Sequence, residues 1–149
     1  MTKKIMAIEF YLGHPMESRK EVREWELSIE KKFPRIKLIN PFYDTCNKYM
    51  KEVMEQIDNG IKLRDDVNAD IVVEQDIQHL SKSQGMIAVL DKNITYGTPM
   101  EMVYAYKIFN LPVFAIVTNG EHTRPWIRKH SSQIFTKTED FENFLIKNY

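Results

Sequence analysis

Residues 86–117, MIAVLDKNITYGTPMEMVYAYKIFNLPVFAIV, carry the pattern that decides the fold. The two ends of this stretch, Met86 to Leu90 and Pro112 to Val117, are short apolar runs typical of buried strands. Between them, Thr98 to Phe109 has apolar residues at helical spacing. A strand, a helix and a second strand in this order predict two parallel strands joined by a right-handed crossover.

The same alternation continues on both sides of this unit. Apolar spacing and turn residues predict further strands at Lys4–Leu12, Ile36–Ile39 and Gln133–Phe135, and further helices at Glu17–Phe33, Asp70–Ser83, from near Arg124-Pro125, and Glu139–Asn148. The polar region Asp44–Asp66 is predicted to be an irregular or partly helical insertion. We therefore expect a three-layer α/β fold with a Rossmann/flavodoxin-like parallel sheet of about five strands, helices on both faces, and one domain over residues 1–149.

Composition excludes several classes of protein. The 149 residues carry 21 Lys and Arg against 21 Asp and Glu, so no strong basic field attracts a nucleic acid polymer. The longest apolar run, Leu111 to Val117, is far shorter than the roughly 20 residues of a membrane span. The single cysteine, Cys46, forms no internal disulfide and fits a reducing compartment, so we expect a cytoplasmic protein. Scattered histidines and the lone Gly13 after its strand predict neither a metal nor a dinucleotide cofactor.

In parallel α/β sheets, the ligand crevice lies beyond the carboxyl ends of the strands. Here those ends are the turn from Tyr11 to Pro15, the loop from Asp91 to Thr98 and the loop after Val117. We expect a binding site to be assembled from these segments.

Two acidic residues lie on faces that should be buried. On the helix predicted over Asp70–Lys82, Asp76 falls within the apolar arc of Ala69, Val72, Val73, Ile77 and Leu80, while Glu74, Gln75 and Gln78 fall on the polar side. On the helix over Thr98–Phe109, Glu101 falls among Tyr104, Ala105 and Ile108. A buried carboxylate is costly unless it is paired, hydrogen-bonded or placed at a cleft.

Each acid also has a purely structural explanation. Asp76 can be a hydrogen-bonded structural acid, and Glu101 can close a capping box in which Thr98 is the N-cap and Pro99 the first helical residue. Capping does not explain a second inward acid on a neighbouring helix. Two convergent carboxylates suit glycosyl transfer, in which one attacks the anomeric carbon and the other serves the leaving group. The helix start should keep Glu101 ionised, and Tyr11 is placed to hydrogen-bond it.

Three segments together resemble the nucleoside 2-deoxyribosyltransferase-like family, which includes the transferases and related nucleotide N-glycosidases. They are FYLGHP at 10–15, EQDI at 74–77 through Val89, and GTPMEMVYA at 97–105. The resemblance implies that Glu101 is the nucleophile toward the sugar C1′, Asp76 the acid that assists the base, and Tyr11 the group that orients Glu101. It also implies a homo-oligomer in which a neighbour completes each pocket, to which aromatic residues such as Tyr104 and Phe109 would contribute.

The resemblance is incomplete where the substrate would bind. Many members place an Asp closer to the Gly-Thr element to bind the base, whereas Asp91 lies early in this loop. Cations at Arg19 and Arg124 favour a 5′-phosphate, although the second can equally lie on a solvated helix face. Tyr96 and Trp126 can stack on a base or pack at the core edge, and His14 is expected at the rim. The full set of predicted substrate-binding residues is Gly13, His14, Ser18, Arg19, Asp91, Tyr96, Gly97, Thr98, Arg124 and Trp126.

These observations predict an enzyme that cleaves the N-glycosidic bond of a 2′-deoxynucleoside or its 5′-monophosphate and passes the sugar to water or another base. Two alternatives stay open: a nucleotide-binding sensor without turnover, and a flavodoxin-like regulatory domain. The base preference does not follow from the sequence.

Overall fold

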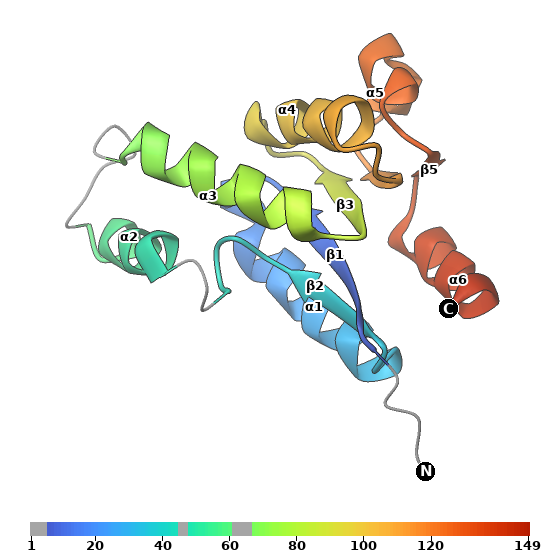
Figure 1. Cartoon of the computed structure of the whole chain (residues 1–149), viewed down its shortest axis with the longest axis horizontal. Coiled ribbons are helices and arrows are strands. Elements are labelled where there is room, and N and C mark those ends of the chain that lie inside the picture. The colour runs from blue at the N-terminus through green and yellow to red at the C-terminus, as the bar shows by residue number, and fades with distance from the viewer. Residues whose placement is uncertain (1–5, 45–47, 61–66) are drawn as a thin grey trace.

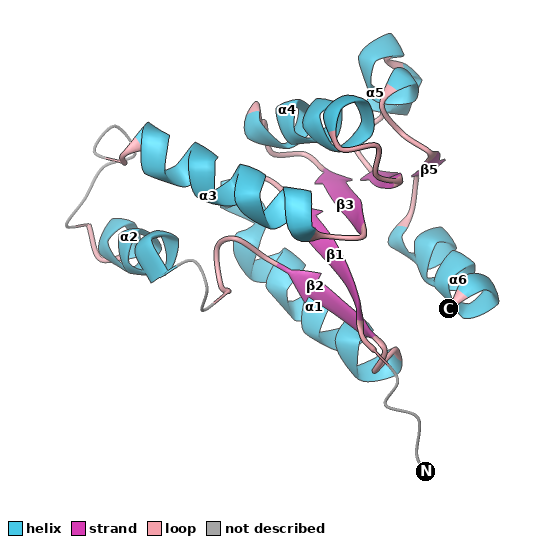
Figure 2. Ribbon diagram, viewed as in Figure 1, coloured by secondary structure: helices cyan, strands magenta, loops and turns pink. Residues whose placement is uncertain are grey.

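The computed structural model describes residues 6–44, 48–60 and 67–149, and within them it forms one five-stranded parallel sheet (Figures 1 and 2). The strands are β1 (Ile8–Gly13), β2 (Ile36–Ile39), β3 (Gly85–Leu90), β4 (Val113–Val117) and β5 (Gln133–Phe135). Their order across the sheet is β2-β1-β3-β4-β5, and every neighbouring pair is parallel. The predicted three-layer α/β class is confirmed.

Helices cover both faces of the sheet. A 3-10 turn, η1 (Met16–Ser18), leads into α1 (Arg19–Lys32), which packs on one face together with α6 (Thr138–Asn148). On the other face lie α3 (Ala69–Lys82) and α4 (Gly97–Val103), which continues into the π-helical turn η3 (Tyr104–Ile108). The remaining helices are α2 (Lys48–Asp58), the 3-10 turn η4 (Glu121–Thr123) and α5 (Pro125–Lys129).

Alternation along β1 sorts its side chains between the two faces. Phe10 and Leu12 join the core beneath α1 and α6, whereas Tyr11 joins the core beneath α3 and α4. The Tyr11 side chain thus lies on the same face of the sheet as the two helices that carry Asp76 and Glu101.

The order of strands places a crevice beside β1. After β1 the chain crosses to β2 on one side, and after α3 it returns to β3 on the other side, so β1 and β3 flank the topological switch point. The loops after β1 and β3 diverge there, which leaves room for a ligand beyond the strands.

Some predicted details differ from the structure. The predicted helix over Thr98–Phe109 changes to π geometry after Val103, with the Phe109 amide donating to the Tyr104 carbonyl. The π turn shifts the helical register, so Tyr104 and Ile108 face solvent while Ala105 stays buried. On α3 the predicted apolar arc is only partly covered, because Ala69 and Val73 are exposed.

The predicted insertion contains a helix with a small core of its own. Met50, Val53 and Met54 of α2 are buried against a group that includes Phe42 and Val72. Cys46 and the first residues of the predicted strand from Lys4 lie outside the described residues. No helix in the described parts of the chain combines the length and the apolar character needed to cross a bilayer.

Candidate active site

A cavity of about 680 Å³ lies at the carboxyl ends of β1, β2 and β3, and both predicted catalytic acids line it. Asp76 reaches it from α3 and Glu101 from α4, while Gly13 ends β1 and Phe42 follows β2. Tyr96 lines the same cavity and is 77% exposed, so solvent reaches it. The two carboxyls therefore share one accessible hollow.

Glu101 is held by the strand beneath it. The Tyr11 hydroxyl, which is buried in the core, donates a hydrogen bond to Glu101 Oε2. A Cβ at Gly13 would lie 2.7 Å from Met86 Cε and 3.5 Å from Glu101 Oε1, so a larger residue there would displace the end of the Met86 side chain while only touching Glu101. The geometry matches the contact expected between Tyr11 and Glu101, although their catalytic roles stay predictions.

The capping explanation of Glu101 does not describe the structure. Helix α4 begins at Gly97, two residues earlier than the capping box requires, and its N-cap residue Tyr96 makes no side-chain cap bond. The Thr98 amide is 3.4 Å from Thr95 Oγ1, and Glu101 is bonded to Tyr11 instead. Helix capping therefore does not explain why Glu101 points inward.

Burial perturbs both acids. It raises the pKa of Asp76 to about 7, and Asp76 Oδ1 is buried with no hydrogen-bond partner among the described residues. Burial, and then the nearby Asp76 charge, raise the pKa of Glu101 to about 8, against the lowering effect of the Tyr11 hydrogen bond. Burial therefore opposes the ionised state that the helix start is expected to favour in Glu101.

The phenol of Tyr11 stays a donor. Burial is the largest cause that raises the pKa of Tyr11 well above its usual value, and the Glu101 and Asp76 charges add to it. A protonated hydroxyl bonded to one carboxyl oxygen stabilises negative charge on Glu101 and so partly offsets the effect of burial on its pKa.

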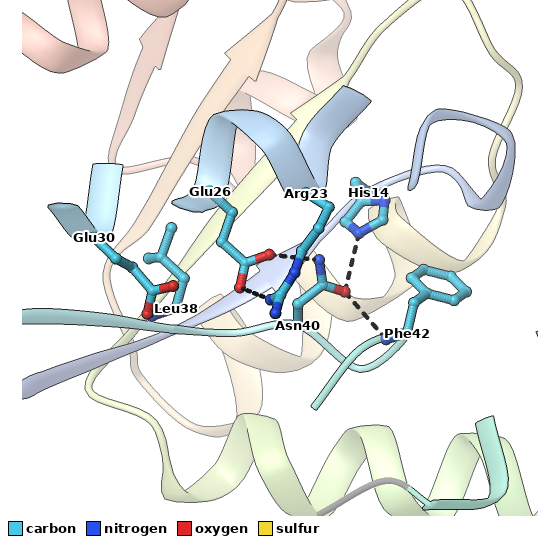
Figure 3. Close-up of polar contacts among 7 residues, drawn as sticks. All are labelled: His14, Arg23, Glu26, Glu30, Leu38, Asn40 and Phe42. Atoms are coloured by element: carbon cyan, nitrogen blue, oxygen red, sulfur yellow. Dashed lines mark hydrogen bonds and ion pairs between the residues drawn. The ribbon is translucent and has the colours of Figure 1, made fainter. Parts of the chain in front are cut away.

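A third buried acid, Glu26 of α1, is shown with its partners in Figure 3. Its carboxylate accepts from Arg23 Nη1 at 2.8 Å and from Asn40 Nδ2 at 3.0 Å. The Asn40 oxygen in turn accepts from the Phe42 amide at 3.1 Å and lies 3.2 Å from His14 Nε2. Sequence reasoning missed this group, although Glu26 lies between Val22 and Ile29 on the apolar face of its helix, the same signal that identified Asp76.

No family profile and no curated protein matches this sequence. Solved structures do match its fold. One is a 2-deoxyribosyltransferase from the psychrotolerant bacterium Bacillus psychrosaccharolyticus, with 19% identity, a TM-score of 0.63, and coverage of 91% of this chain and 90% of that one. Another is a conserved protein from Enterococcus faecalis V583, with 14% identity, a TM-score of 0.65, and coverage of 96% and 99%. The chain has a nucleoside 2-deoxyribosyltransferase-like fold.

Within this deoxyribosyltransferase-like fold, half of the predicted substrate-binding residues line the cavity: Gly13, His14, Tyr96, Gly97 and Thr98. His14 is 4% exposed, so its expected place at the rim was wrong. Its Nδ1 lies 2.9 Å from the Pro15 carbonyl oxygen, and its other ring nitrogen faces Asn40. Burial lowers the pKa of His14.

The other half lies outside this cavity. Asp91 lines a neighbouring cavity of about 840 Å³, and its Oδ1 accepts from the Asn93 amide at 2.9 Å. The Ser18 hydroxyl accepts from Asn93 Nδ2 at 2.7 Å. The structure therefore leaves Asp91 no direct place beside the two catalytic candidates.

The predicted phosphate-binding cations are also committed elsewhere. Arg19 donates to the Met16 carbonyl and forms an ion pair with Asp58 of α2. Arg124 pairs with Glu121 on the surface, and Trp126 is 74% exposed and stacked on His130. The structure does not bring these residues to the cavity of Asp76 and Glu101. Among the described residues, no group of three or more His, Cys, Asp or Glu is placed to hold a metal ion.

Proposed function

We propose that this chain cleaves the N-glycosidic bond of a 2′-deoxynucleoside, with Glu101 as nucleophile and Asp76 as general acid. The observation that carries the proposal is the pair of acids lining one accessible cavity, with a tyrosine hydroxyl as the hydrogen-bond donor to Glu101. The deoxyribosyltransferase-like fold supports the same reaction class.

The proposed first step uses one proton shared by the two acids. A Glu101 carboxylate oxygen attacks C1′, the bond from C1′ to the base nitrogen breaks, and the Asp76 proton passes to the departing base. Burial raises the pKa of Glu101 to about 8 and that of Asp76 to about 7, so the resting pair keeps a proton near neutral pH. The reactive form has that proton on Asp76, and the Tyr11 hydrogen bond supports it by lowering the pKa of Glu101.

The second step releases the sugar. Asp76, now ionised, accepts a proton from water or from an incoming nucleobase as that acceptor attacks C1′. The bond from C1′ to the Glu101 oxygen breaks as the acceptor attacks, and the carboxylate of Glu101 is restored. Water gives hydrolysis, and a second base gives transfer.

The ion pairs of Arg19 with Asp58 and of Arg124 with Glu121 support a nucleoside as substrate over its 5′-monophosphate. A phosphate dianion that entered the cavity would meet three acidic residues in its lining, Glu17, Asp76 and Glu101. Lys92 also lines the cavity, whereas the charge of Arg19 is paired with Asp58. Like charges brought together oppose binding. Release of base from matched pairs of nucleosides and monophosphates checks this preference, which a faster reaction of the monophosphates would overturn.

The reaction itself is tested by incubation with a panel of 2′-deoxynucleosides, with and without a second free base, and chromatography of the products. We expect free base or an exchanged nucleoside from the wild type and neither from E101Q. Tight nucleoside binding without any product would instead favour the non-catalytic sensor, for which the position of Asp91 outside the cavity is the supporting observation.

We also propose that the chain forms a homo-oligomer through the α3 and α4 face. Val73, Met100, Tyr104 and Ile108 leave apolar side chains exposed there. Light scattering after size exclusion should give a mass of at least two chains, and I108E should lower it; a monomeric wild type would contradict the assembly.

A further inference from the structure

We propose that Asn40 is a positioning residue of the candidate active site, which fixes the cavity wall made by His14 and Phe42. This inference rests on the proposed function. Asn40 directly follows β2, is 1% exposed, and is not among the residues that line the cavity. Any effect it has on a ligand must therefore pass through its neighbours.

The orientation of the Asn40 side-chain amide is fixed by Glu26. Its Nδ2 faces Glu26 Oε2 at 3.0 Å, and an ionised carboxylate only accepts hydrogen bonds. Glu26 is itself 1% exposed and anchored by Arg23, with Glu30 one turn further along α1 as the next acid (Figure 3). The Asn40 oxygen must consequently point toward the cavity wall.

That oxygen joins two loops from neighbouring strands. It accepts from the backbone amide of Phe42, after β2, and lies within hydrogen-bond distance of His14 Nε2, after β1. The rings of His14 and Phe42 lie 4.9 Å apart between centroids, and both residues line the cavity with Asp76 and Glu101. One side-chain oxygen thus joins the His14 and Phe42 parts of the wall of the cavity that Asp76 and Glu101 also line.

This arrangement predicts an effect on binding more than on chemistry. The reacting groups are held separately, by the Tyr11 hydrogen bond and by α3 and α4. Loss of the Asn40 contacts should raise KM about tenfold and change kcat by less than about threefold, because the wall loosens while the nucleophile keeps its place.

An exchange of the two functional groups tests the inference. In N40D, two carboxylates face each other where the 3.0 Å contact now lies. They repel each other at high pH, and the contact is restored as a hydrogen bond when one of the two carboxylates takes up a proton at lower pH. The ratio of N40D to wild-type KM should be about ten at pH 8 and approach one near pH 5.5. In the double variant E26Q/N40D, the amide introduced on α1 donates to the carboxylate introduced after β2, and its oxygen accepts from Arg23. The KM of the double variant should therefore return close to the wild-type value at both pH values.

S132A is the matched control, since Ser132 accepts from the Val113 amide at 3.0 Å at the opposite end of the sheet. It should leave KM unchanged. An N40D variant with wild-type KM, or a double variant no better than N40D, would overturn the positioning role. If the wild type binds nucleosides without cleaving them, the proposed reaction fails and the same ratios are measured on Kd; if it neither binds nor cleaves them, both proposals fail.

Discussion

Glu26 and the pair Asp76–Glu101 are buried acids on opposite faces of one sheet, and they differ in their partners. The Glu26 carboxylate accepts from Arg23 and Asn40, which partly offset the rise in its pKa caused by burial. Asp76 has an orphaned oxygen, and Glu101 bonds to the Tyr11 hydroxyl beside a second acid. A buried acid with a cation and an amide donor belongs to the scaffold; a pair without a cation, facing a cavity, keeps its capacity to react.

The same difference has an energetic side. Desolvation destabilises every buried carboxylate, and only hydrogen bonds and opposite charges offset it. Glu26 has both, so its removal should weaken the fold. Asp76 and Glu101 lack a positive partner in the described structure, so their neutral replacements should not weaken it.

The largest expected effect is on catalysis. E101Q should lower the rate of base release at least about a thousandfold, because the amide is a poor nucleophile, while the melting temperature stays equal or rises. Single-turnover kinetics and thermal melts measure both. E142Q, which alters an exposed ion pair with Lys32, is the control and should keep the wild-type rate.

The second effect concerns the leaving group. D76N should lower the rate about a hundredfold, with the greatest loss for bases that most need protonation to depart. Removing the Asp76 charge should also lower the pKa of Glu101, so the acid limb of the rate profile moves to lower pH. An acid limb that stays in place would show that the two acids do not interact.

The third effect is on stability. E26A leaves Asn40 Nδ2 and the Arg23 guanidinium without the Glu26 acceptor. It should reduce the free energy of unfolding by about 2 kcal/mol. The figure is kept low because the Arg23 side chain is about a third exposed, so water can solvate its charge. Urea unfolding compares it with D76A, which should leave the free energy of unfolding equal to that of the wild type or higher. An equal loss of unfolding free energy in E26A and D76A would contradict the distinction between a structural acid at Glu26 and a reactive acid at Asp76.

The smallest effect is a pH dependence. The folded-state pKa values of Asp76 and Glu101 lie above their unfolded values, so the native state binds more protons and stability falls as the pH rises from about 4 to 8. E101Q has no carboxyl at this position to lose a proton. Relative to the wild type, its free energy of unfolding should therefore rise by about 1 kcal/mol between pH 5 and pH 8, a figure kept low because solvent reaches the cavity. Unfolding curves at the two pH values should diverge; parallel behaviour would contradict the raised pKa.

Periodicity predicted most of the fold because its signals are local. The strand Ile36–Ile39 and the strand Gln133–Phe135 have the predicted bounds, and Asp76 and Glu101 do share a cavity. The π turn after Val103 was not predicted, because the helical spacing over Thr98–Phe109 does not distinguish π from α geometry.

The misplaced residues failed for a different reason. Arg19 and Arg124 were assigned to a phosphate from their charge alone. The partner of Arg19, Asp58, depends on how α2 folds back, whereas the partner of Arg124, Glu121, lies three residues earlier in the sequence. Charge predicts that an arginine needs an acceptor and does not predict which one. The Asn40 contacts likewise join three elements that no local window contains.

The most direct test of the account is to identify the residue that carries the sugar. Wild-type protein mixed with excess 2′-deoxynucleoside, quenched in acid during turnover and digested, should give a deoxyribosyl group on the peptide that contains Glu101, and E101Q should give none. A sugar adduct on another residue, or base release by E101Q at the wild-type rate, would contradict it.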